Sequence, residues 1–376
     1  MKLKPKITIA DHFGEMKDPR VEWSIQHKLI DIITIAICAV ICGADTWVDI
    51  EMYGQSKYEW LKQFLELANG IPSHDTFARV FSRLDPEQFQ NCFLNWVKSI
   101  SKMVAKEVVA IDGKILRHSY DNGGDKKAIH MVSAWATEQR LVLGQVKVDE
   151  KSNEITAIPE LLKVLSLRGC IVTIDAMGCQ KEIVKLIAGQ EADYIITLKK
   201  NQGSLYKRVE ALFSEALRSK YQGFTHSTNR RSEQNHGREE TRCCVMLSNI
   251  QNQIDPDGKW QNLQSIGRLD LMRTVNGKTK IETRYFISSL PNNAKLLADS
   301  VRQHWGIENA LHWVLDVAFR EDDSRIRKDN APQNFAILRH IAHNLLQQNK
   351  SVKTGIKNKR LKAGWDNEYL AKVLFG

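Results

Sequence analysis

Three strand-like runs follow one another closely between Glu107 and Val148, and this spacing constrains the fold more than any other feature of the chain. The last two runs are joined tightly at Glu138-Gln139, and consecutive strands with short connections pair antiparallel. We therefore expect a three-stranded antiparallel meander. The runs, each largely apolar, are EVVAIDGK, AIHMVSAWAT and LVLGQVKV.

The pattern then changes to an alternation of helices and strands. A helix is predicted near Ile158 to Leu167, followed by the strand CIVTID, a helix from Gln180 to Ala188 and the strand ADYIITLK. Strands separated by helices run parallel, because the helix returns the chain to the same end of the sheet. Three meandering strands followed by strand, helix and strand give the order of a ribonuclease H-like mixed sheet. We predict this α/β fold for residues 106–349.

Two of the predicted strands end in aspartate. Asp112 ends the first strand and Asp175 the fourth, so pairing of these strands would place two carboxylates side by side. Like charges at this separation are unfavourable unless a cation lies between them, and hard divalent cations prefer oxygen ligands. The pair therefore predicts a Mg²⁺ or Mn²⁺ site for phosphoryl transfer. For either residue alone, a turn former or a helix cap is the commoner explanation.

A third carboxylate, Glu308, lies far downstream in HWGIENALHW. His312 and Asp316 follow at i+4 and i+8, which places three polar side chains on one stripe of an otherwise apolar helix predicted from Ala294 to about Phe319. Burying such a stripe is costly without a metal or a charged partner. We interpret Glu308 as the third ligand of a site for two divalent ions. A stripe that faces solvent is the alternative.

Basic residues surround the three acids in the sequence and are candidates for contacts with phosphate. Arginine binds phosphate oxygens in bidentate geometry, and lysine supplies a point charge. Taken singly, each is more simply explained as a surface charge or as a partner of the acids at positions 321–323. The candidates are Lys114, Arg117, Arg302, His304, His312, Arg320 and Arg325, with Arg327 close by.

The N-terminal part of the chain has apolar spacings of three and four residues, which predicts a helical domain over residues 1–105. Within it, Ser73 is a predicted N-cap for a short helix that carries Arg79 and Arg83 and ends at Asp85-Pro86. A short helix of this kind between others resembles the reading head of a helix-turn-helix that binds DNA ends. A small bundle with solvated arginines explains the pattern equally well.

Composition limits the class of partner and the compartment. Lys and Arg outnumber Asp and Glu by 54 to 44, for a formal charge of +10, and such an excess favours nucleic acid as a partner. The seven cysteines contain no C-x-x-C pair, which fits reduced thiols in the cytosol. The longest apolar run, Leu29 to Cys42, is too short to cross a bilayer and contains Asp31. We expect a cytoplasmic, nucleoid-associated protein with no membrane contact.

Two further segments complete the predicted organisation. Residues 221–289 have mostly strand-like alternation with a turn at Asn276-Gly277, and they predict a β-rich insertion between the last sheet strand and the helix of Glu308. A helix is predicted over 333–348. The stretch from Lys350 to Lys362 has six basic residues and no acidic one, so residues 350–376 are expected to form a basic tail with a short helix.

Taken together, these segments resemble bacterial insertion-sequence transposases of the DDE class, specifically the H-repeat-associated branch. The resemblance covers nearly the whole chain. It implies a ribonuclease H-like catalytic domain with a β-strand insertion, binding of terminal inverted repeats, and Mg²⁺-dependent strand cleavage and strand transfer. It assigns the catalytic and metal-binding triad to Asp112, Asp175 and Glu308. The segments that carry it are AIDGK-x-x-R, HMVSAW, TIDAMGCQ, YIITLKKNQ, HGREETR, RYFISSL and HWGIENALHWVLDVAFREDDSR.

One departure from the wider superfamily concerns the basic residues around the third acid. Its usual Tyr, Arg and Lys places hold Val301, His304 and Leu315, so the implied phosphate contacts fall to other arginines nearby. Two alternative hypotheses stay open: a DNA-binding protein derived from a transposase that has lost catalysis, and a structure-specific nuclease on the same fold. Because transposition joins two ends, we expect a homodimer on double-stranded DNA, with element ends and target DNA as partners.

Overall fold

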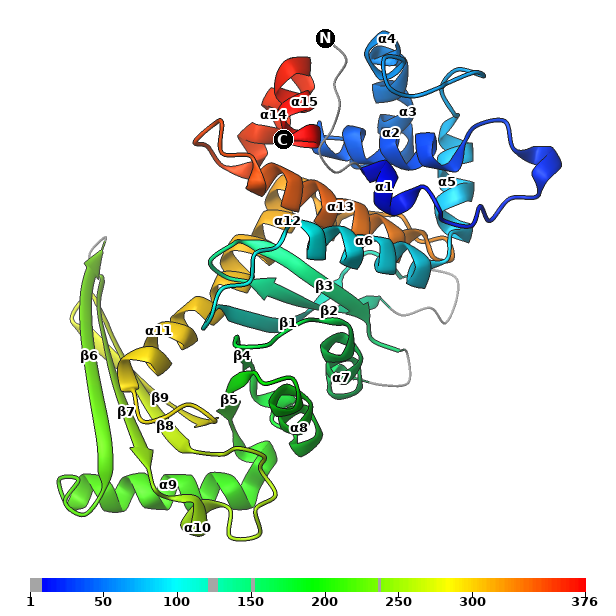
Figure 1. Ribbon diagram of the computed structural model, residues 1–376. Helices are drawn as coiled ribbons and strands as arrows, with labels where there is room; N and C mark the ends of the chain where they lie inside the picture. Colours follow the sequence, from blue (N-terminus) through cyan, green and yellow to red (C-terminus); the bar gives the residue numbers. More distant parts are fainter. Residues whose placement is uncertain (1–8, 121–127, 150–152, 236–237) are drawn as a thin grey trace.

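The computed structural model describes residues 9–120, 128–149, 153–235 and 238–376. It is a mixed α/β structure in which helices cover a large sheet (Figure 1). The strands are β1 (Val108–Leu116), β2 (Ile129–Ala136), β3 (Leu141–Lys147), β4 (Ile171–Ile174), β5 (Asp193–Leu198), β6 (Thr225–Asn235), β7 (Arg238–Ser248), β8 (Ser265–Val275) and β9 (Lys278–Ser288).

The α-helices include two long elements that flank the sheet and several shorter ones. They are α1 (Ile9–Phe13), α2 (Leu29–Ile41), α3 (Trp47–Ser56), α4 (Tyr58–Leu61), α5 (His74–Arg83), α6 (Pro86–Ile100), α7 (Glu154–Val164), α8 (Lys181–Gly189), α9 (Gly203–Arg218), α10 (Gln251–Ile254), α11 (Ala294–His304), α12 (Trp313–Phe319), α13 (Ala331–Gln348), α14 (Ile356–Trp365) and α15 (Asn367–Phe375). Short 3₁₀ turns are η1 (Glu22–Ser24), η2 (Ala176–Gly178), η3 (Lys200–Gln202) and η5 (Glu321–Asp323), and η4 (Ile307–His312) is a π-helix.

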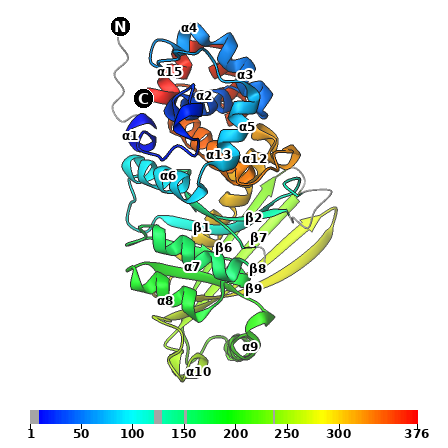
Figure 2. The same ribbon diagram turned by 90° about the vertical axis from the view of Figure 1, so that its right-hand side faces the viewer.

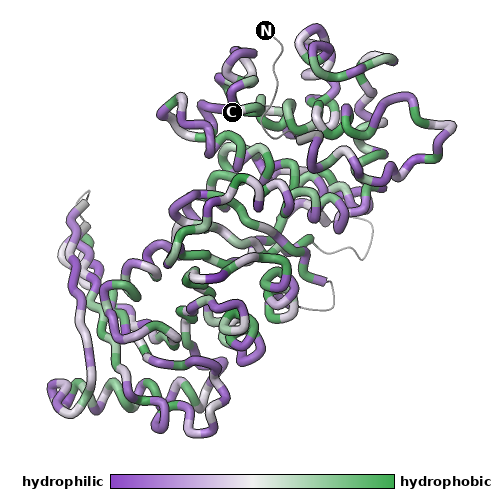
Figure 3. The backbone as a smooth tube through the Cα atoms, viewed as in Figure 1, coloured by the Kyte–Doolittle hydropathy of each residue, from purple (hydrophilic) through white to green (hydrophobic). Residues whose placement is uncertain are grey.

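Within the described ranges the strands form one sheet in the order β3-β2-β1-β4-β5-β9-β8-β7-β6. The first three strands pair antiparallel, and β1, β4 and β5 pair parallel, which is the arrangement expected from the sequence. The segment predicted as an insertion supplies β6 to β9. Its last strand, β9, pairs antiparallel with β5, so these strands extend the same sheet. Their distal ends are hydrophilic, whereas the inner strands are hydrophobic (Figure 3).

Helices pack on both faces of the inner sheet. On one face, α7 contacts β2 and β3, and α8 contacts β5; on the other, α11 crosses β1 and β4 (Figures 1 and 2). Asp112 and Lys114 project from the same face of β1 because they are two residues apart. This face meets η4 and α12. The sheet therefore presents the acidic part of β1 to the helical stretch that carries Glu308.

The N-terminal helices and the C-terminal helices share one core. The buried helix α13 packs against α2, α5 and α6, and α14 packs against α2 and α15. The sequence predicts a basic tail with one short helix over residues 350–376, whereas the structure has two helices there. Apolar side chains such as Ile356, Ala363 and Leu370 are buried, and their burial holds this basic segment against the body of the protein.

None of the helices in the described part of the chain combines the length and the hydropathy that a membrane crossing needs. The long apolar run of the N-terminal part forms α2, which is buried, and its Asp31 is only 5% exposed.

Candidate active site

Asp112 and Asp175 lie where the pairing of two parallel strands ends. The last paired residues of β1 and β4 are Ile111 and Ile174, and the two aspartates directly follow them in the sequence. The structure differs from the prediction in one detail, because β1 does not end at Asp112 but continues to Leu116 in register with β2. Asp112 is thus held by backbone pairing on one side and open on the other.

Asp175 also has the local role that the alternative explanation assigns to such a residue. It is the N-cap of η2, and its Oδ1 accepts a hydrogen bond from the backbone N–H of Met177 at 2.9 Å. This bond fixes the direction of the side chain and satisfies one backbone donor of the short helix. The second carboxylate oxygen stays available for another partner.

Glu308 lies on a wider helical turn than the sequence predicts. The stretch predicted as one α-helix from Ala294 to about Phe319 is α11, the π-helix η4 and α12 in succession. A π-helical turn holds an extra residue, and such turns occur frequently at functional sites. Here it contains Glu308 and His312, and Glu308 is exposed.

The three acids line one open cavity of about 760 Å³ at the sheet edge. Polar side chains from β4, from the residues after β5, from β9 and from α11 complete its wall. The main polar lining residues are Asp112, Thr173, Asp175, Thr197, Lys199, Lys200, Tyr206, Glu282, Thr283, Arg284, His304 and Glu308.

Burial raises the pKa of Asp112 to about 7, and the negative charges of Glu308, Glu154 and Asp175 add to the rise, against a hydrogen bond with the Gly113 backbone. Three other carboxylates are therefore close enough to raise the pKa of Asp112. None of the three cavity acids forms an ion pair with Lys or Arg among the described residues. The three acids thus lack a direct Lys or Arg partner, although Lys199, Lys200 and Arg284 line the same cavity.

The chemistry of these donors fits a divalent cation, because Mg²⁺ and Mn²⁺ favour carboxylate oxygens and keep several bound waters. The spacing fits less closely. Among the residues that the structure describes, no group of three or more His, Cys, Asp or Glu side chains is arranged so that it could hold a metal ion. The acids supply a suitable donor set for a cation but do not form a closed ligand shell.

Replacing Asp112 by asparagine is expected to stabilise the metal-free protein near pH 8. The ordinary pKa of this carboxyl is 3.8 and its pKa in the folded chain is about 7, so the folded state binds the proton more tightly. The free energy of unfolding therefore falls as pH rises from 4 to 7. Asparagine does not ionise and avoids this loss, which is on the order of 2–4 kcal/mol.

The measurement is urea or thermal unfolding in EDTA over this pH range, with Glu182→Gln, an exposed substitution on α8, as the control. The variant and the parent should agree near pH 4 and separate toward pH 8. Parallel pH profiles of the parent and Asp112→Asn would show that folding does not raise the pKa of Asp112.

Two residues of the predicted polar stripe each lie close to a residue of β1. His312 Nδ1 lies 3.6 Å from Asp112 Oδ2, and Asp316 Oδ1 lies 2.5 Å from Lys114 Nζ. Burial lowers the pKa of His312 to about 4 and that of His304 to about 4, and His304 also hydrogen-bonds Thr173 at 2.9 Å. Both rings are neutral near pH 7. A contact of either ring with phosphate, which stays a prediction, would use a neutral N–H donor.

Lys114 is likewise engaged elsewhere. Its Nζ lies 2.5 Å from Asp316, 3.4 Å from Glu321 and 3.0 Å from Asp322, and its side chain is only 11% exposed. The buried Glu321 has Arg339 Nη1 as a second neighbour at 3.8 Å. Three carboxylates around one ammonium group hold Lys114 in an ion network, and its contact with phosphate stays a prediction.

The predicted arginines lie in three different places. Arg117 is exposed and pairs with Asp322 at 3.2 Å. Arg302 pairs with Glu233 at 2.7 Å and lines a second cavity between α11 and the outer strands. Arg320 and Arg325 line a third cavity, against the N-terminal helices. None of these four arginines therefore lines the acid cavity.

Sequence reasoning missed several residues that line the acid cavity. Lys199 and Lys200 follow β5, and Arg284 comes from β9. The signal for the lysines was present in the sequence, because β4 and β5 are parallel and the residues after both strands share one sheet edge. The signal for Arg284 was absent, since it depends on the pairing of β9 with β5. Glu154, at the start of α7, pairs with His130 at 2.8 Å and was also missed.

Two protein families match this chain, and together they cover most of it. The family described as Transposase DDE domain matches residues 104–345, and the family described as DDE_Tnp_1-associated matches residues 10–97. The "H repeat-associated putative transposase YhhI" of Escherichia coli K12 is 44% identical over 98% of both chains. The "Putative transposase YncI" of Escherichia coli O157:H7 is 42% identical over 98% of this chain and 94% of its own.

Two other similarities are more limited. The "Inactive transposase YbfQ" of Escherichia coli K12 is 47% identical over 20% of this chain and 89% of its own. Among solved structures, the piggyBac transposase synaptic complex with hairpin DNA is similar with a TM-score of 0.42 and 10% identity, over 98% of this chain and 77% of that one.

Proposed function

Because the chain belongs to the family described as Transposase DDE domain, we propose that it is a DNA transposase of an insertion-sequence element. It binds the terminal inverted repeats of the element and catalyses Mg²⁺-dependent strand cleavage and strand transfer. The observation that carries this proposal is the presence of Asp112, Asp175 and Glu308 in one cavity. The strand order β3-β2-β1-β4-β5 supports a ribonuclease H-like catalytic domain.

Asp112, Asp175 and Glu308 are the proposed ligands for two Mg²⁺ or Mn²⁺ ions. Such ions make an attacking water or sugar hydroxyl more nucleophilic and stabilise a leaving 3′ oxygen. The raised pKa of Asp112 supports this role, since a bound cation would remove the electrostatic cost of its ionisation. The N-cap bond of Asp175 keeps that carboxylate at the mouth of the cavity, and neutral His304 and His312 add no competing charge.

Double-stranded DNA is the proposed partner, as element ends and as target, with a homodimer holding two ends. Residues 1–105 are the proposed region for end binding. Its α5 begins at His74 with the Ser73 side chain as N-cap and carries the exposed Arg79 and Arg83. Residues 106–349, with the strands of 221–289, are the proposed catalytic domain.

The proposal is tested by incubating the purified protein with a duplex that carries the terminal inverted repeat of the element. Cleavage at the end of the repeat is expected with Mg²⁺ or Mn²⁺ and not in EDTA or with a scrambled repeat. Sedimentation or light scattering of the complex reports whether two protomers hold the DNA. A protein that neither binds nor cleaves this duplex would refute the proposal.

A second candidate is a DNA-binding protein that retains the fold but has lost catalysis. The chain is similar over 20% of its length to a shorter protein named as an inactive transposase, and this similarity supports the second candidate. Specific binding of the repeat without cleavage under any divalent ion would establish this candidate. Preferential cleavage of branched over linear substrates would instead indicate a structure-specific nuclease.

A further inference from the structure

A cavity of about 630 Å³ lies away from the acids, between the N-terminal helices and the segment after α12. One wall comes from α3 and α5, including Trp47, Val48 and Ala78. The opposite wall is the segment 320–331, with Arg320, Arg325, Arg327 and Lys328. We refer to this cavity as the interdomain groove. The proposed catalytic domain and the proposed end-binding region therefore contribute one side each.

The groove carries positive charge that the protein does not use internally. Arg325 and Lys328 are exposed and form no ion pair among the described residues. Arg79 and Arg83, one turn apart on the exposed side of α5, have no ion-pair partner there either. The backbone of α5 lies directly along the opposite wall, since Asn330 N–H donates to Ser82 O at 3.2 Å.

The acidic residues of the groove are already paired. Asp45 lies 3.2 Å from Arg360 Nη2, and Asp323 lies 3.3 Å from Arg320 Nε. Asp75 has His74 Nε2 at 3.7 Å. Arg325 and Lys328 are therefore the cations of the lining that have no ion-pair partner among the described residues, whereas Arg79 and Arg83 lie outside the lining, on the exposed side of α5.

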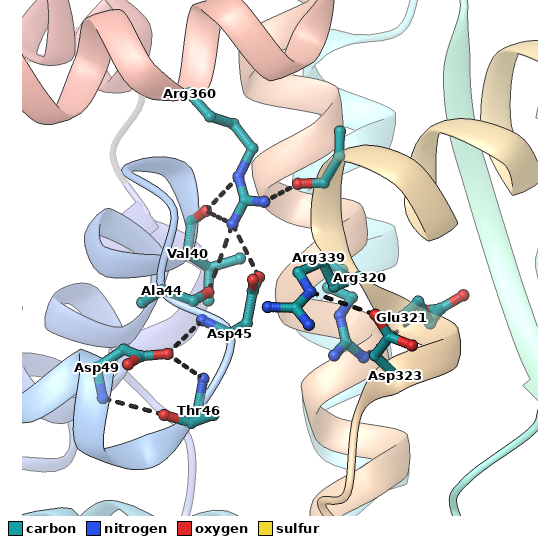
Figure 4. A network of polar contacts seen from close by, with 11 residues as sticks. Val40, Ala44, Asp45, Thr46, Asp49, Arg320, Glu321, Asp323, Arg339 and Arg360 are labelled. Carbon is teal, nitrogen blue, oxygen red and sulfur yellow. Dashed lines mark hydrogen bonds and ion pairs between the residues drawn. The ribbon is translucent and has the colours of Figure 1, made fainter.

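The two walls are fixed to each other by a buried arginine. Arg360 donates to the carbonyl oxygens of Val40 and Ala44 behind the helical wall, and to that of Ala318 before the opposite wall (Figure 4). Its side chain is 5% exposed. Arg339, buried beside Glu321, lies between the same two walls (Figure 4). A groove with fixed walls loses little conformational entropy when it binds a rigid ligand.

We propose that the interdomain groove binds the sugar-phosphate backbone of duplex DNA, with Arg325 and Lys328 in its wall and with Arg79 and Arg83 on the exposed side of α5, the helix whose Ala78 lines the groove. This inference rests on the proposed function and adds the surface that holds the DNA. Unpaired cations in the wall of the groove and on the neighbouring helix suit the repeated phosphates of a duplex, and side-chain contacts to phosphate set position without reading sequence.

The test compares Arg325→Ala/Lys328→Ala with the matched control Lys185→Ala/Lys207→Ala, which removes two exposed charges on α8 and α9. Binding of a labelled duplex of arbitrary sequence is measured in EDTA against salt concentration. Each lost phosphate contact lowers the slope of log K against log salt by about 0.9. The groove variant should lose about two units of slope and roughly tenfold in affinity, and Arg79→Ala/Arg83→Ala should do the same.

The outcomes separate this inference from the proposed function. A parent protein that does not bind duplex DNA would overturn both. If the parent binds with a steep salt slope and the groove variant has the same slope as the control, only the assignment of the groove is overturned. Equal loss in the groove variant and the control would likewise indicate a diffuse charge effect. Unchanged circular dichroism of all variants verifies that these exposed substitutions leave the fold intact.

Discussion

Replacement of Asp175 by asparagine is expected to reduce metal-dependent cleavage of an element end by about 10³-fold or more, while the fold and end binding persist. Removing one carboxylate ligand forfeits several kcal/mol of transition-state stabilisation, which corresponds to a loss of this size in rate. Asparagine is the informative substitution because its side-chain oxygen can still accept the hydrogen bond from Met177 N–H that caps η2.

A comparison with Asp175→Ala separates ligand loss from loss of the cap. Alanine removes both the charge and the capping oxygen, and a lost N-cap costs about 1 kcal/mol of stability. If Asp175 serves only as a cap, the asparagine variant will cleave at the rate of the parent and only the alanine variant will be impaired. If it is a ligand, both will be inactive, and only the alanine variant will also unfold more easily. Single-turnover cleavage and thermal unfolding provide the two readouts.

Replacement of Arg360 by leucine is expected to cost about 3–5 kcal/mol of folding free energy, the range found when one partner of a buried charged network is removed. The substitution leaves the carbonyl oxygens of Val40, Ala44 and Ala318 without this donor and Asp45 without its ion-pair partner. The arginine also stacks over Phe319 at 4.3 Å, and leucine preserves only part of that contact.

Thermal unfolding measures this loss, with Lys362→Leu as the control. Lys362 is on the same helix and is 42% exposed, and its Nζ lies 3.2 Å from Asp366 and 5.4 Å from the centre of the Tyr369 ring. Its replacement should change stability by less than about 0.5 kcal/mol, because both contacts are at the surface. Asp45→Asn added to Arg360→Leu should recover part of the stability, since it removes the unpaired charge but not the unpaired carbonyls. Equal midpoints for the parent and Arg360→Leu would contradict the bridging role of Arg360.

The sequence was most informative where structure depends on neighbouring residues. Apolar alternation and short connections predicted the strands and their order, because side-chain period and turn length are local properties. The N-cap of α5 at Ser73 was predicted for the same reason. The positions of Asp112 and Asp175 beside the last paired residues of β1 and β4 followed from that order.

Interactions between residues far apart in the chain could not be predicted from the sequence. Lys114 has Asp316 and Asp322 as partners, 202 and 208 residues away, and no local pattern distinguishes a lysine that enters such a network from one that meets phosphate. Likewise, the buried role of Arg360 depends on Val40, 320 residues earlier. The basic stretch predicted a tail with one short helix, because the buried Lys359 and Arg360 are indistinguishable in composition from their exposed neighbours.

The π-helix η4 has a consequence for how this stretch tolerates change. Glu308 reaches the cavity while Asp316 reaches Lys114, and the wider turn between them sets their relative direction around the helix axis. Adding one residue between them would rotate one acid by about 100° relative to the other, whereas deleting one residue from 309–311 would let an ordinary α-helix form with nearly the same relative direction, because the wider turn holds one extra residue. Side-chain replacements leave this angle unchanged. We therefore expect the stretch to accept many substitutions, and loss of the extra residue of the π-turn, over evolutionary time but to resist insertions.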